Sequence, residues 1–344
     1  MEDIARDCLS ELVERCLVQV GTSGSTGTIK GFRIHDLVRD MCLLKAKEES
    51  FLQIKYYLQE NTSSVAAEAT QLGKIRRLAI YMDEKVDRLV SSRDETNGHV
   101  RSLLFFGLEE WMPKSEKRLL SPLKDFKMLR VLKVDRLHKR EVELPSSTLN
   151  RIQSLIVKND TNSGEEQAMQ IVSSCRGIYK LTLDGPIAEL PKELHNYPNL
   201  TKLVLWSCGL KEDQMRILEK LPNLTILKLL EVFEEKTKIL VFSKGGFPSL
   251  EVLYVSDMHQ ITKLRVEEGA MPRLCRLHIQ HFHVLTTLPD GLRYLTNLRE
   301  LTIKQMRREL HCRIQEDGED FYKIQHIPSL VIGEPLNYYL DGPR

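Results

Sequence analysis

The chain has 344 residues, of which 42% are hydrophobic and 28% charged, a composition that excludes wholesale disorder. Fifty basic residues stand against 48 acidic ones, so the net charge of +2 gives no overall field that would attract nucleic acid or an acidic membrane. No apolar run approaches the roughly 20 residues of a membrane-spanning helix, and residues 1–7 lack the apolar core of a signal peptide.

Residues 1–50 form the first predicted unit. Apolar residues recur at helical spacing over 4–17 and again over 37–46. Between these helices, two short apolar segments flank a glycine-rich turn at 21–27, which predicts a hairpin. Helix, hairpin and helix together predict the end of a winged-helix domain, a remnant too short to be a complete one. The mostly polar residues 51–74 that follow predict a linker with partial helix.

The strongest signal in the chain is a repeat with apolar residues at positions 1, 4 and 6. Ten units match it, and their first residues are Ile75, Val100, Leu129, Ile152, Ile178, Leu200, Leu224, Leu250, Leu274 and Leu298. The units start about 25 residues apart on average, which is the period of leucine-rich repeats. Ten matches in one register make this a strong prediction.

The repeat spacing dictates an architecture. Alternate side chains of a strand point to opposite faces, so positions 4 and 6 face inward and positions 3, 5 and 7 face outward. One unit cannot bury its apolar face alone, so the units must stack. We therefore predict an α/β solenoid over 75–328, a leucine-rich-repeat horseshoe with a parallel β-sheet on its concave face. Residues 306–328 are expected to cap it, and residues 329–344 to form a flexible tail.

The outward positions of the strands indicate a binding face. They carry eight basic and three acidic residues, so this face has a charge of +5 while the whole chain has +2. Aromatic residues are interleaved with these cations, as in protein-binding hot spots. We expect this face to dock an acidic protein surface through Arg77, Phe106, Lys133, Lys158, Lys180, Lys202, Trp206, Lys228, Tyr254, Arg276 and Lys304. The alternative is that the lysines only keep a solvated sheet soluble.

Segments at both ends of the chain resemble one family. They are Glu2-Asp3-Ile4-Ala5-Arg6-Asp7, Phe32-Arg33-Ile34-His35-Asp36-Leu37-Val38-Arg39-Asp40 and Gly318-Glu319-Asp320-Phe321-Tyr322-Lys323-Ile324-Gln325-His326-Ile327-Pro328. Together with the irregular repeats, they resemble plant intracellular immune receptors, the coiled-coil, nucleotide-binding, leucine-rich-repeat disease-resistance proteins. Ile34-His35-Asp36 is similar to the Met-His-Asp motif of that family, with Ile in place of Met. The resemblance covers nearly the whole chain.

The resemblance implies a non-enzymatic recognition module that acts in plant defence. In this family the repeats sense a pathogen effector or a modified host protein, and they restrain a nucleotide switch. The partner is then a protein ligand or the receptor's own nucleotide-binding domain.

The resemblance also implies that His35, with Asp36 beside it, contacts ADP in a relative that carries the nucleotide-binding domain. That domain should precede residue 1, and no Gly-x-x-x-x-Gly-Lys-Ser/Thr phosphate loop occurs in the chain. We therefore expect a truncated product or a partial sequence, with no cofactor of its own; ADP or ATP is implied only for the complete architecture. For this chain, the simpler interpretation is that Asp36 lies at a helix start, where the dipole favours a negative charge.

Other chemistries find little support in the sequence. His278, His281 and His283 form a small cluster, but no carboxylate or cysteine near them in the sequence completes a ligand set, so we expect no metal site. We find no nucleophile elbow and no His-Glu-x-x-His motif, and expect no enzyme. The first predicted helix is acidic, the wrong sign for binding nucleic acid through phosphates.

The cysteines and glycosylation sequons bear on the compartment. The seven cysteines are odd in number and scattered, which favours reduced thiols in a cytoplasmic protein over a disulfide framework. One alternative is a cytosolic leucine-rich-repeat scaffold or adaptor without a switch. Another is an extracellular receptor domain, which glycans at Asn159 or Asn199 would support and free thiols would reject.

Overall fold

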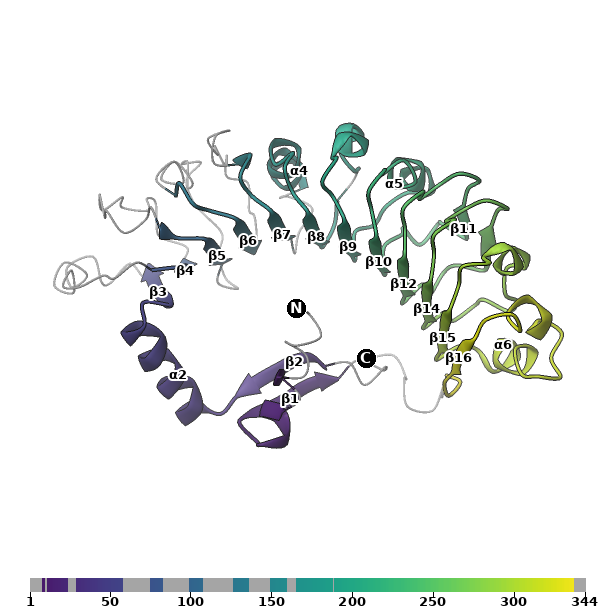
Figure 1. Ribbon diagram of the computed structural model, residues 1–344, viewed down its shortest axis with the longest axis horizontal. Coiled ribbons are helices and arrows are strands. Elements are labelled where there is room, and N and C mark those ends of the chain that lie inside the picture. The colour runs from purple at the N-terminus through teal and green to yellow at the C-terminus, as the bar shows by residue number, and fades with distance from the viewer. Residues whose placement is uncertain are drawn as a thin grey trace.

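Twelve parallel strands form one continuous sheet in the computed structural model, which describes residues 8–9, 11–23, 29–57, 75–82, 99–107, 126–135, 149–159, 165–187 and 189–336. In sheet order the strands are β3 (Leu52–Tyr57), β4 (Arg77–Met82), β5 (Ser102–Gly107), β6 (Val131–Asp135), β7 (Ser154–Lys158), β8 (Lys180–Asp184), β9 (Lys202–Trp206), β10 (Ile226–Leu230), β12 (Val252–Ser256), β14 (Arg276–Gln280), β15 (Glu300–Lys304) and β16 (Ser329–Ile332). Figure 1 shows that the sheet curves into an arc with the strands on its inner side. The predicted horseshoe is confirmed.

The core consists of the apolar positions of the ten predicted units. In each unit, the residues at positions 1, 4 and 6 are at most 5% exposed. The strands pair in register, so that Leu181, Leu203 and Leu227 stack as neighbouring rungs. Full burial of one such side chain contributes about 1.5–3 kcal/mol, and the stack supplies three per repeat.

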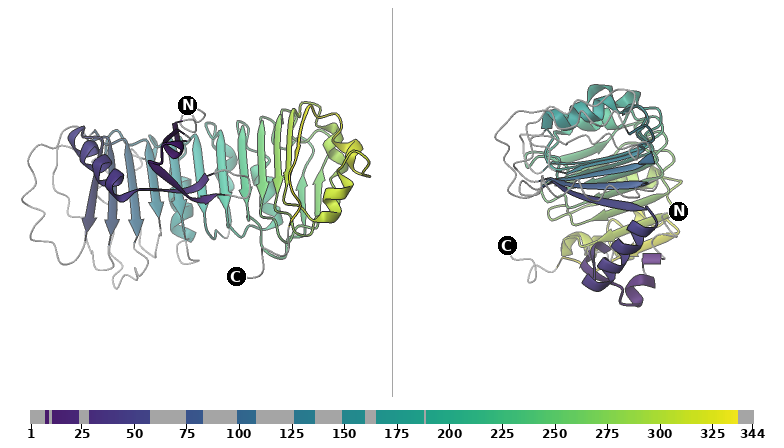
Figure 2. Two further views of the ribbon diagram at one scale, coloured as in Figure 1. Left: turned by 90° about the horizontal axis from the view of Figure 1, so that it is seen from below. Right: turned by 90° about the vertical axis from the view of Figure 1, so that its left-hand side faces the viewer.

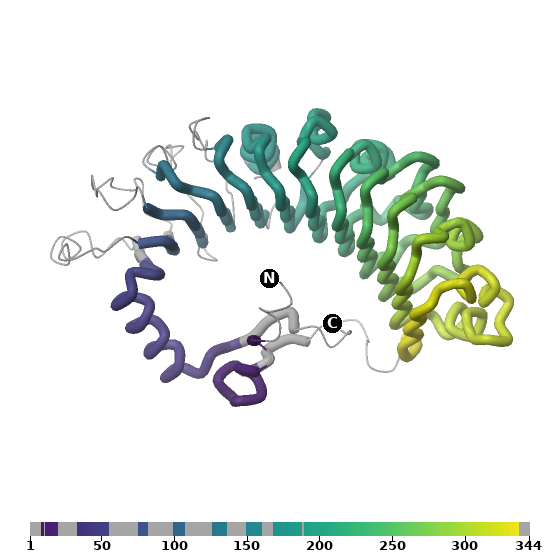
Figure 3. The backbone as a smooth tube through the Cα atoms, viewed as in Figure 1, coloured from purple at the N-terminus to yellow at the C-terminus, as the bar shows by residue number. Residues whose placement is uncertain are grey.

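The outer side of the arc carries short helices and a second small sheet. The helices are α4 (Glu165–Ser174), η6 (Lys192–Asn196), η7 (Glu212–Gln214), α5 (Met215–Leu218), η8 (Asp290–Tyr294), α6 (Arg308–Arg313) and η9 (Phe321–Lys323). Strands β11 (Ile239–Phe242) and β13 (Lys263–Val266) pair in parallel, and Leu264 and Val266 are buried there. The tube in Figure 3 shows how the repeats from β8 onward return through this outer layer to the next strand.

The N-terminal unit has the expected order of elements. β1 (Val18–Ser23) and β2 (Ile29–Ile34) pair as an antiparallel hairpin, and α2 (Asp36–Glu48) follows. Of the first predicted helix, residues 11–14 are helical, and most of its N-terminal half lies outside the described residues. The hairpin and α2 lie on the open side of the arc, opposite the inner wall (Figures 1 and 2).

Two expected segment boundaries differ from the structure. The predicted linker begins with β3, which pairs with β4 along its whole length; residues 58–74 lie outside the described residues. The residue of β3 that pairs with Leu78 is Gln53, and this polar residue is why the apolar pattern does not reveal the strand. The predicted tail begins with β16, which pairs with β15 and places Leu330 and Ile332 against the core. The predicted cap over 306–328 is therefore the outer loop between the last two strands.

Candidate protein-binding face

The concave face is built from side chains that point out of the sheet at positions 3, 5 and 7 of each repeat. The structure places all eleven predicted binding residues on strands of this sheet. We call them the concave strip: Arg77, Phe106, Lys133, Lys158, Lys180, Lys202, Trp206, Lys228, Tyr254, Arg276 and Lys304. Four of them (Arg77, Lys180, Trp206 and Arg276) are exposed and seven are half-buried. Neighbouring strands lie about 4.8 Å apart, so the sheet brings together residues that are some 25 positions apart in sequence.

Three outward positions are buried, against the prediction that all of them are exposed. Ala79 is 5% exposed, Ser256 is 0% exposed and Gln280 is 2% exposed. Ala79 is short and sits between longer neighbours on β3 and β5. Ser256 ends β12, where its hydroxyl donates to the carboxylate of Asp257. The concave face is therefore narrower than the repeat pattern alone predicts.

An aromatic and cationic cluster lies at the N-terminal end of the strip. The rings of Tyr81 and Phe106 stack with centroids 4.7 Å apart and planes inclined by 12°. Lys133 Nζ lies 4.5 Å from the centroid of the Phe106 ring and 3.6 Å from a carboxylate oxygen of Asp135. The cation–π contact and the ion pair hold Lys133 in one place, so this cluster is ordered before any partner arrives.

The middle of the strip concentrates positive charge. Lys180 and Lys202 lie directly opposite each other on β8 and β9, an arrangement of like charges that a sheet otherwise disfavours. On the next strands, Lys228 Nζ lies 5.7 Å from the ring centroid of Tyr254, and Tyr254 contacts His278 at 5.6 Å between ring centroids. Burial lowers the pKa of His278, so this imidazole is neutral near pH 7 and the positive charge comes from the lysines.

Comparisons with known proteins match both parts of the chain. A family model described as a leucine-rich repeat region matches residues 50–321, well over half of the chain. A second one, described as the winged helix domain of disease resistance proteins, matches residues 1–42. The chain belongs to the leucine-rich-repeat family of plant disease-resistance proteins. The resemblance inferred from the end segments is thereby confirmed.

Curated relatives of this disease-resistance chain come from Arabidopsis thaliana. "Probable disease resistance RPP8-like protein 2" is 28% identical across 96% of this chain and 49% of its own length. "Disease resistance protein RPP8" is 36% identical across 59% of this chain and 23% of its own length. The chain spans about half the length of the curated relatives that it matches most fully. Among solved structures, a chain of the mouse RP105/MD-1 complex has a TM-score of 0.43 at 17% identity, over 77% of this chain and 48% of that one.

His35 and Asp36 form the start of helix α2 in the disease-resistance chain. His35 is the N-cap, and its Nδ1 accepts the backbone N–H of Leu37 at 3.4 Å. Asp36 lies in the first turn and pairs with Arg39 at 3.4 Å. Both side chains are exposed. A capping histidine followed by a helix-start carboxylate fits the simpler interpretation, and the nucleotide contact stays a prediction drawn from the family resemblance.

The histidine cluster has one carboxylate beside it, which comes from the preceding repeat. Asp257 Oδ1 lies 2.8 Å from Nδ1 of His281, and the rings of His259 and His283 approach to 4.3 Å between centroids. Asp257 and His281 meet because they follow neighbouring strands at the same repeat position. No group of three His, Cys, Asp or Glu side chains in the described part of the chain is arranged to hold a metal ion.

The cysteines and the sequon at Asn159 bear on thiol reactivity and on glycosylation. All seven cysteines are free thiols. Burial raises the pKa of Cys175 and of Cys208 to about 12, so these two stay protonated and unreactive. Asn159 is 2% exposed, and its amide donates to the carbonyl of Pro186, so a glycan there is incompatible with the fold. No helix within the described ranges is both long enough and apolar enough to span a membrane.

Proposed function

We propose that this chain is a non-enzymatic recognition module of a plant disease-resistance receptor and that it binds protein through the concave strip. The observation that carries the proposal is the combination of cations and ordered aromatic rings on one rigid sheet. Such a face can bury rings at the centre of an interface and orient an acidic partner around them.

The partner of the strip is an acidic protein surface. This surface belongs either to a pathogen effector or modified host protein, or to a nucleotide-binding domain of the receptor's own kind. The two kinds of partner can use the same strip. A ligand shifts a two-state receptor when it binds the active state more tightly than the inhibited state. The proposed site of action is the cytoplasm, which fits the free thiols and the buried sequon at Asn159.

The experiment reverses charge in the middle of the strip. The probe is the part of RPP8-like protein 2 that this chain does not match, mixed with the whole chain at low ionic strength. We expect Lys180→Glu, Lys202→Glu and Lys228→Glu together to weaken binding by on the order of tenfold, and salt to reduce the wild-type affinity. The matched control reverses three exposed lysines elsewhere, Lys192, Lys220 and Lys236, and should bind like the wild type. Equal affinity of all three proteins would reject the proposal.

A further inference from the structure

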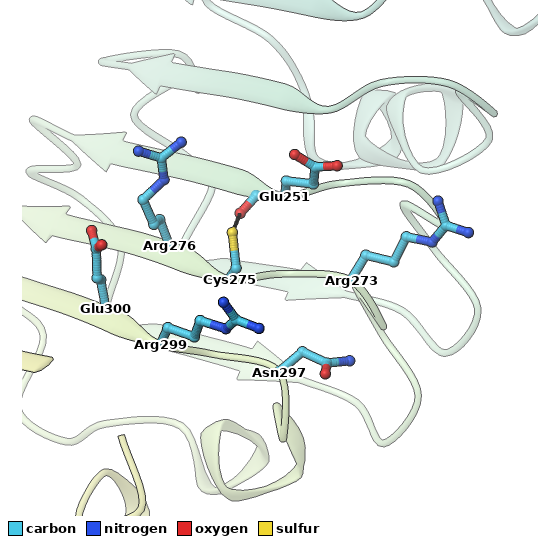
Figure 4. Close-up of a pocket in the computed structure, with 7 residues that line it drawn as sticks. All are labelled: Glu251, Arg273, Cys275, Arg276, Asn297, Arg299 and Glu300. Carbon is cyan, nitrogen blue, oxygen red and sulfur yellow. Dashed lines mark hydrogen bonds between the residues drawn. The ribbon is translucent and has the colours of Figure 1, made fainter. Parts of the chain in front are cut away.

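An open pocket of about 510 Å³ lies at the edge of the sheet where β12, β14 and β15 begin. Three arginines, two glutamates, Cys275 and Asn297 line it (Figure 4). The arginines are Arg273, Arg276 and Arg299, and all three are exposed. Of these, only Arg276 belongs to the concave strip, so the pocket is a second surface beside the proposed protein-binding face.

Arg273 departs from a hydrogen-bond ladder that runs along this edge. The residue before position 1 donates to a backbone carbonyl of the preceding repeat, at 2.7 Å in each case, in the pairs Arg151 to Lys127, Asn223 to Pro198, Ser249 to Pro222 and Asn297 to Pro272. Arg273 and Asn199 hold the same position but make no such bond. Arg151 shows that an arginine can join the ladder, whereas the guanidinium of Arg273 does not and stays available to a ligand.

Side chains at position 2 form a second, partial ladder, although arginine also holds this position at Arg76, Arg101 and Arg130. There, Thr225 donates to the carbonyl of Thr201 at 3.0 Å, and Cys275 Sγ donates to the carbonyl of Glu251 at 3.2 Å. Arg299 follows Cys275 at this position, and its side chain donates to no carbonyl of the preceding repeat. Figure 4 shows its guanidinium beside Cys275, in the pocket. Two neighbouring positions at the edge of the pocket thus carry a guanidinium group that makes no ladder bond.

The arginines of the pocket are not neutralised by ion pairs. None of the three guanidinium groups forms an ion pair with any residue that the structure describes, although Glu251 and Glu300 line the same pocket. Arg276 and Glu300 are even register partners on β14 and β15. A guanidinium presents a planar fork of donors that matches a carboxylate in two parallel hydrogen bonds. An incoming carboxylate would also relieve the repulsion among three neighbouring cations.

We propose that this pocket binds the carboxylate of an Asp or Glu side chain in an acidic segment of a partner protein. Arg273 and Arg299 donate to that carboxylate. Glu251 and Glu300 disfavour ligands with a higher density of negative charge, such as phosphate groups and nucleic acid. The site does not depend on the concave strip, because it has its own cations and its own edge of the sheet.

The chain supplies substitutions that should remove the site without harming the fold. Arg273→Asn installs the ladder residue of Asn223 and Asn297, and Arg299→Thr installs that of Thr225. The probes, tested on the whole chain by calorimetric titration at low ionic strength, are a triaspartate peptide blocked at both ends, a matching trilysine peptide and inorganic phosphate. The control pair, Arg151→Asn with Arg101→Thr, changes the same two repeat positions outside the pocket and removes the same charge.

We expect triaspartate to bind the wild type more tightly than trilysine or phosphate does. Arg273→Asn with Arg299→Thr should weaken that binding at least tenfold, the control pair less than twofold, and both should keep or raise the melting temperature. Equal loss in the control pair, no preference over trilysine, or phosphate binding as tight as triaspartate would each overturn the proposal. The concave-strip reversal at Lys180, Lys202 and Lys228 should leave triaspartate binding in place, which separates failure here from failure of the proposed function.

Discussion

The two ends of the sheet are finished in different ways. At the first strand, β3, Gln53 holds the position of the leucine stack, whereas at the last strand, β16, Leu330 holds it and Ile332 also packs against the core. Phe51, just before β3, stays 42% exposed and packs under the guanidinium of Arg77. A repeat stack must close its end rungs. The C-terminal end does so with apolar side chains, and the N-terminal end does so only in part.

A buried polar network adds to the closure at the C-terminal end. Asp320 accepts the backbone N–H of Leu288 at 2.8 Å, and Lys323 Nζ donates to the carbonyl of the same residue at 2.8 Å. Asp320 and Lys323 also pair with each other at 3.0 Å, and Arg313 approaches Asp320 at 3.2 Å. Both partners of Leu288 are nearly fully buried. Because the two ends of the sheet are closed differently, we expect local stability to vary along the solenoid and to be lowest at β3.

The largest expected effect tests this gradient in the core. Leu203→Ala removes a fully buried side chain in mid-stack and should lower the free energy of unfolding by about 2–5 kcal/mol. Ile54→Ala, at a half-buried outward position of β3, should cost less than about 1 kcal/mol. Urea unfolding followed by circular dichroism measures both. Similar losses at the two positions would contradict the gradient.

The next effect concerns the C-terminal network. Asp320→Asn keeps the shape but weakens hydrogen bonds to charged groups, and should cost about 1.5–3 kcal/mol near neutral pH. Although burial alone would raise the pKa of Asp320, hydrogen bonds from Arg313, the Leu288 N–H and Lys323 lower it below its ordinary value.

The sign of this shift predicts a pH dependence. A lowered carboxyl pKa stabilises the fold fully above the unfolded pKa of about 3.9, and the contribution is lost as the pH falls through the folded pKa. The stability difference between wild type and Asp320→Asn should therefore be full at about pH 6 and shrink below about pH 4. Chemical unfolding at these two pH values measures it. A difference that stays constant or grows in acid would show that Asp320 is not held ionised by the network.

Residue patterns predicted the architecture because apolar periodicity and strand geometry are local rules. The last strand was missed although Ile327, Leu330 and Ile332 repeat the apolar spacing, because the glycines and prolines after them favoured a tail. Strand β3 could not be found this way, since polar Gln53 stands where the other strands carry leucine. Its placement depends on pairing with β4, which is a tertiary effect.

The same distinction between local patterns and tertiary contacts applies to the candidate sites. Alternation within strands predicted every residue of the concave strip, and stacking of repeats explains the contact between Phe106 and Lys133. The burial of Ala79 was missed because it depends on the lengths of the neighbouring side chains on β3 and β5. The pocket of Arg273 and Arg299 was missed because its signal is the absence of a ladder bond. Aligning the repeats residue by residue would have shown Arg273 between Ser249 and Asn297, but not Arg299, because Arg76, Arg101 and Arg130 hold the same repeat position.

A smaller effect is expected at the aromatic cluster near the N-terminal end. Phe106→Leu keeps apolar bulk but removes the stack with Tyr81 and the ring under Lys133, and should cost about 1 kcal/mol. Hydrogen exchange of β4, β5 and β6 should rise, while exchange of β14 and β15 should not change. Tyr254→Phe, which keeps its ring, is the control. Increased exchange at the far end would mean that the sheet opens as one unit.

The smallest expected effect comes from adding an apolar side chain to the core at the N-terminal end of the sheet. Gln53 occupies the rung next to Leu78, a position that is apolar in every following strand. Gln53→Leu should therefore raise the free energy of unfolding by about 0.5–1.5 kcal/mol, because it extends the leucine stack by one rung. Gln153→Leu, at an exposed position outside the strands, is the control and should change little. If Gln53→Leu lowers stability instead, the N-terminal end is closed by polar contacts of Gln53, and the two ends are equally well finished by different chemistry.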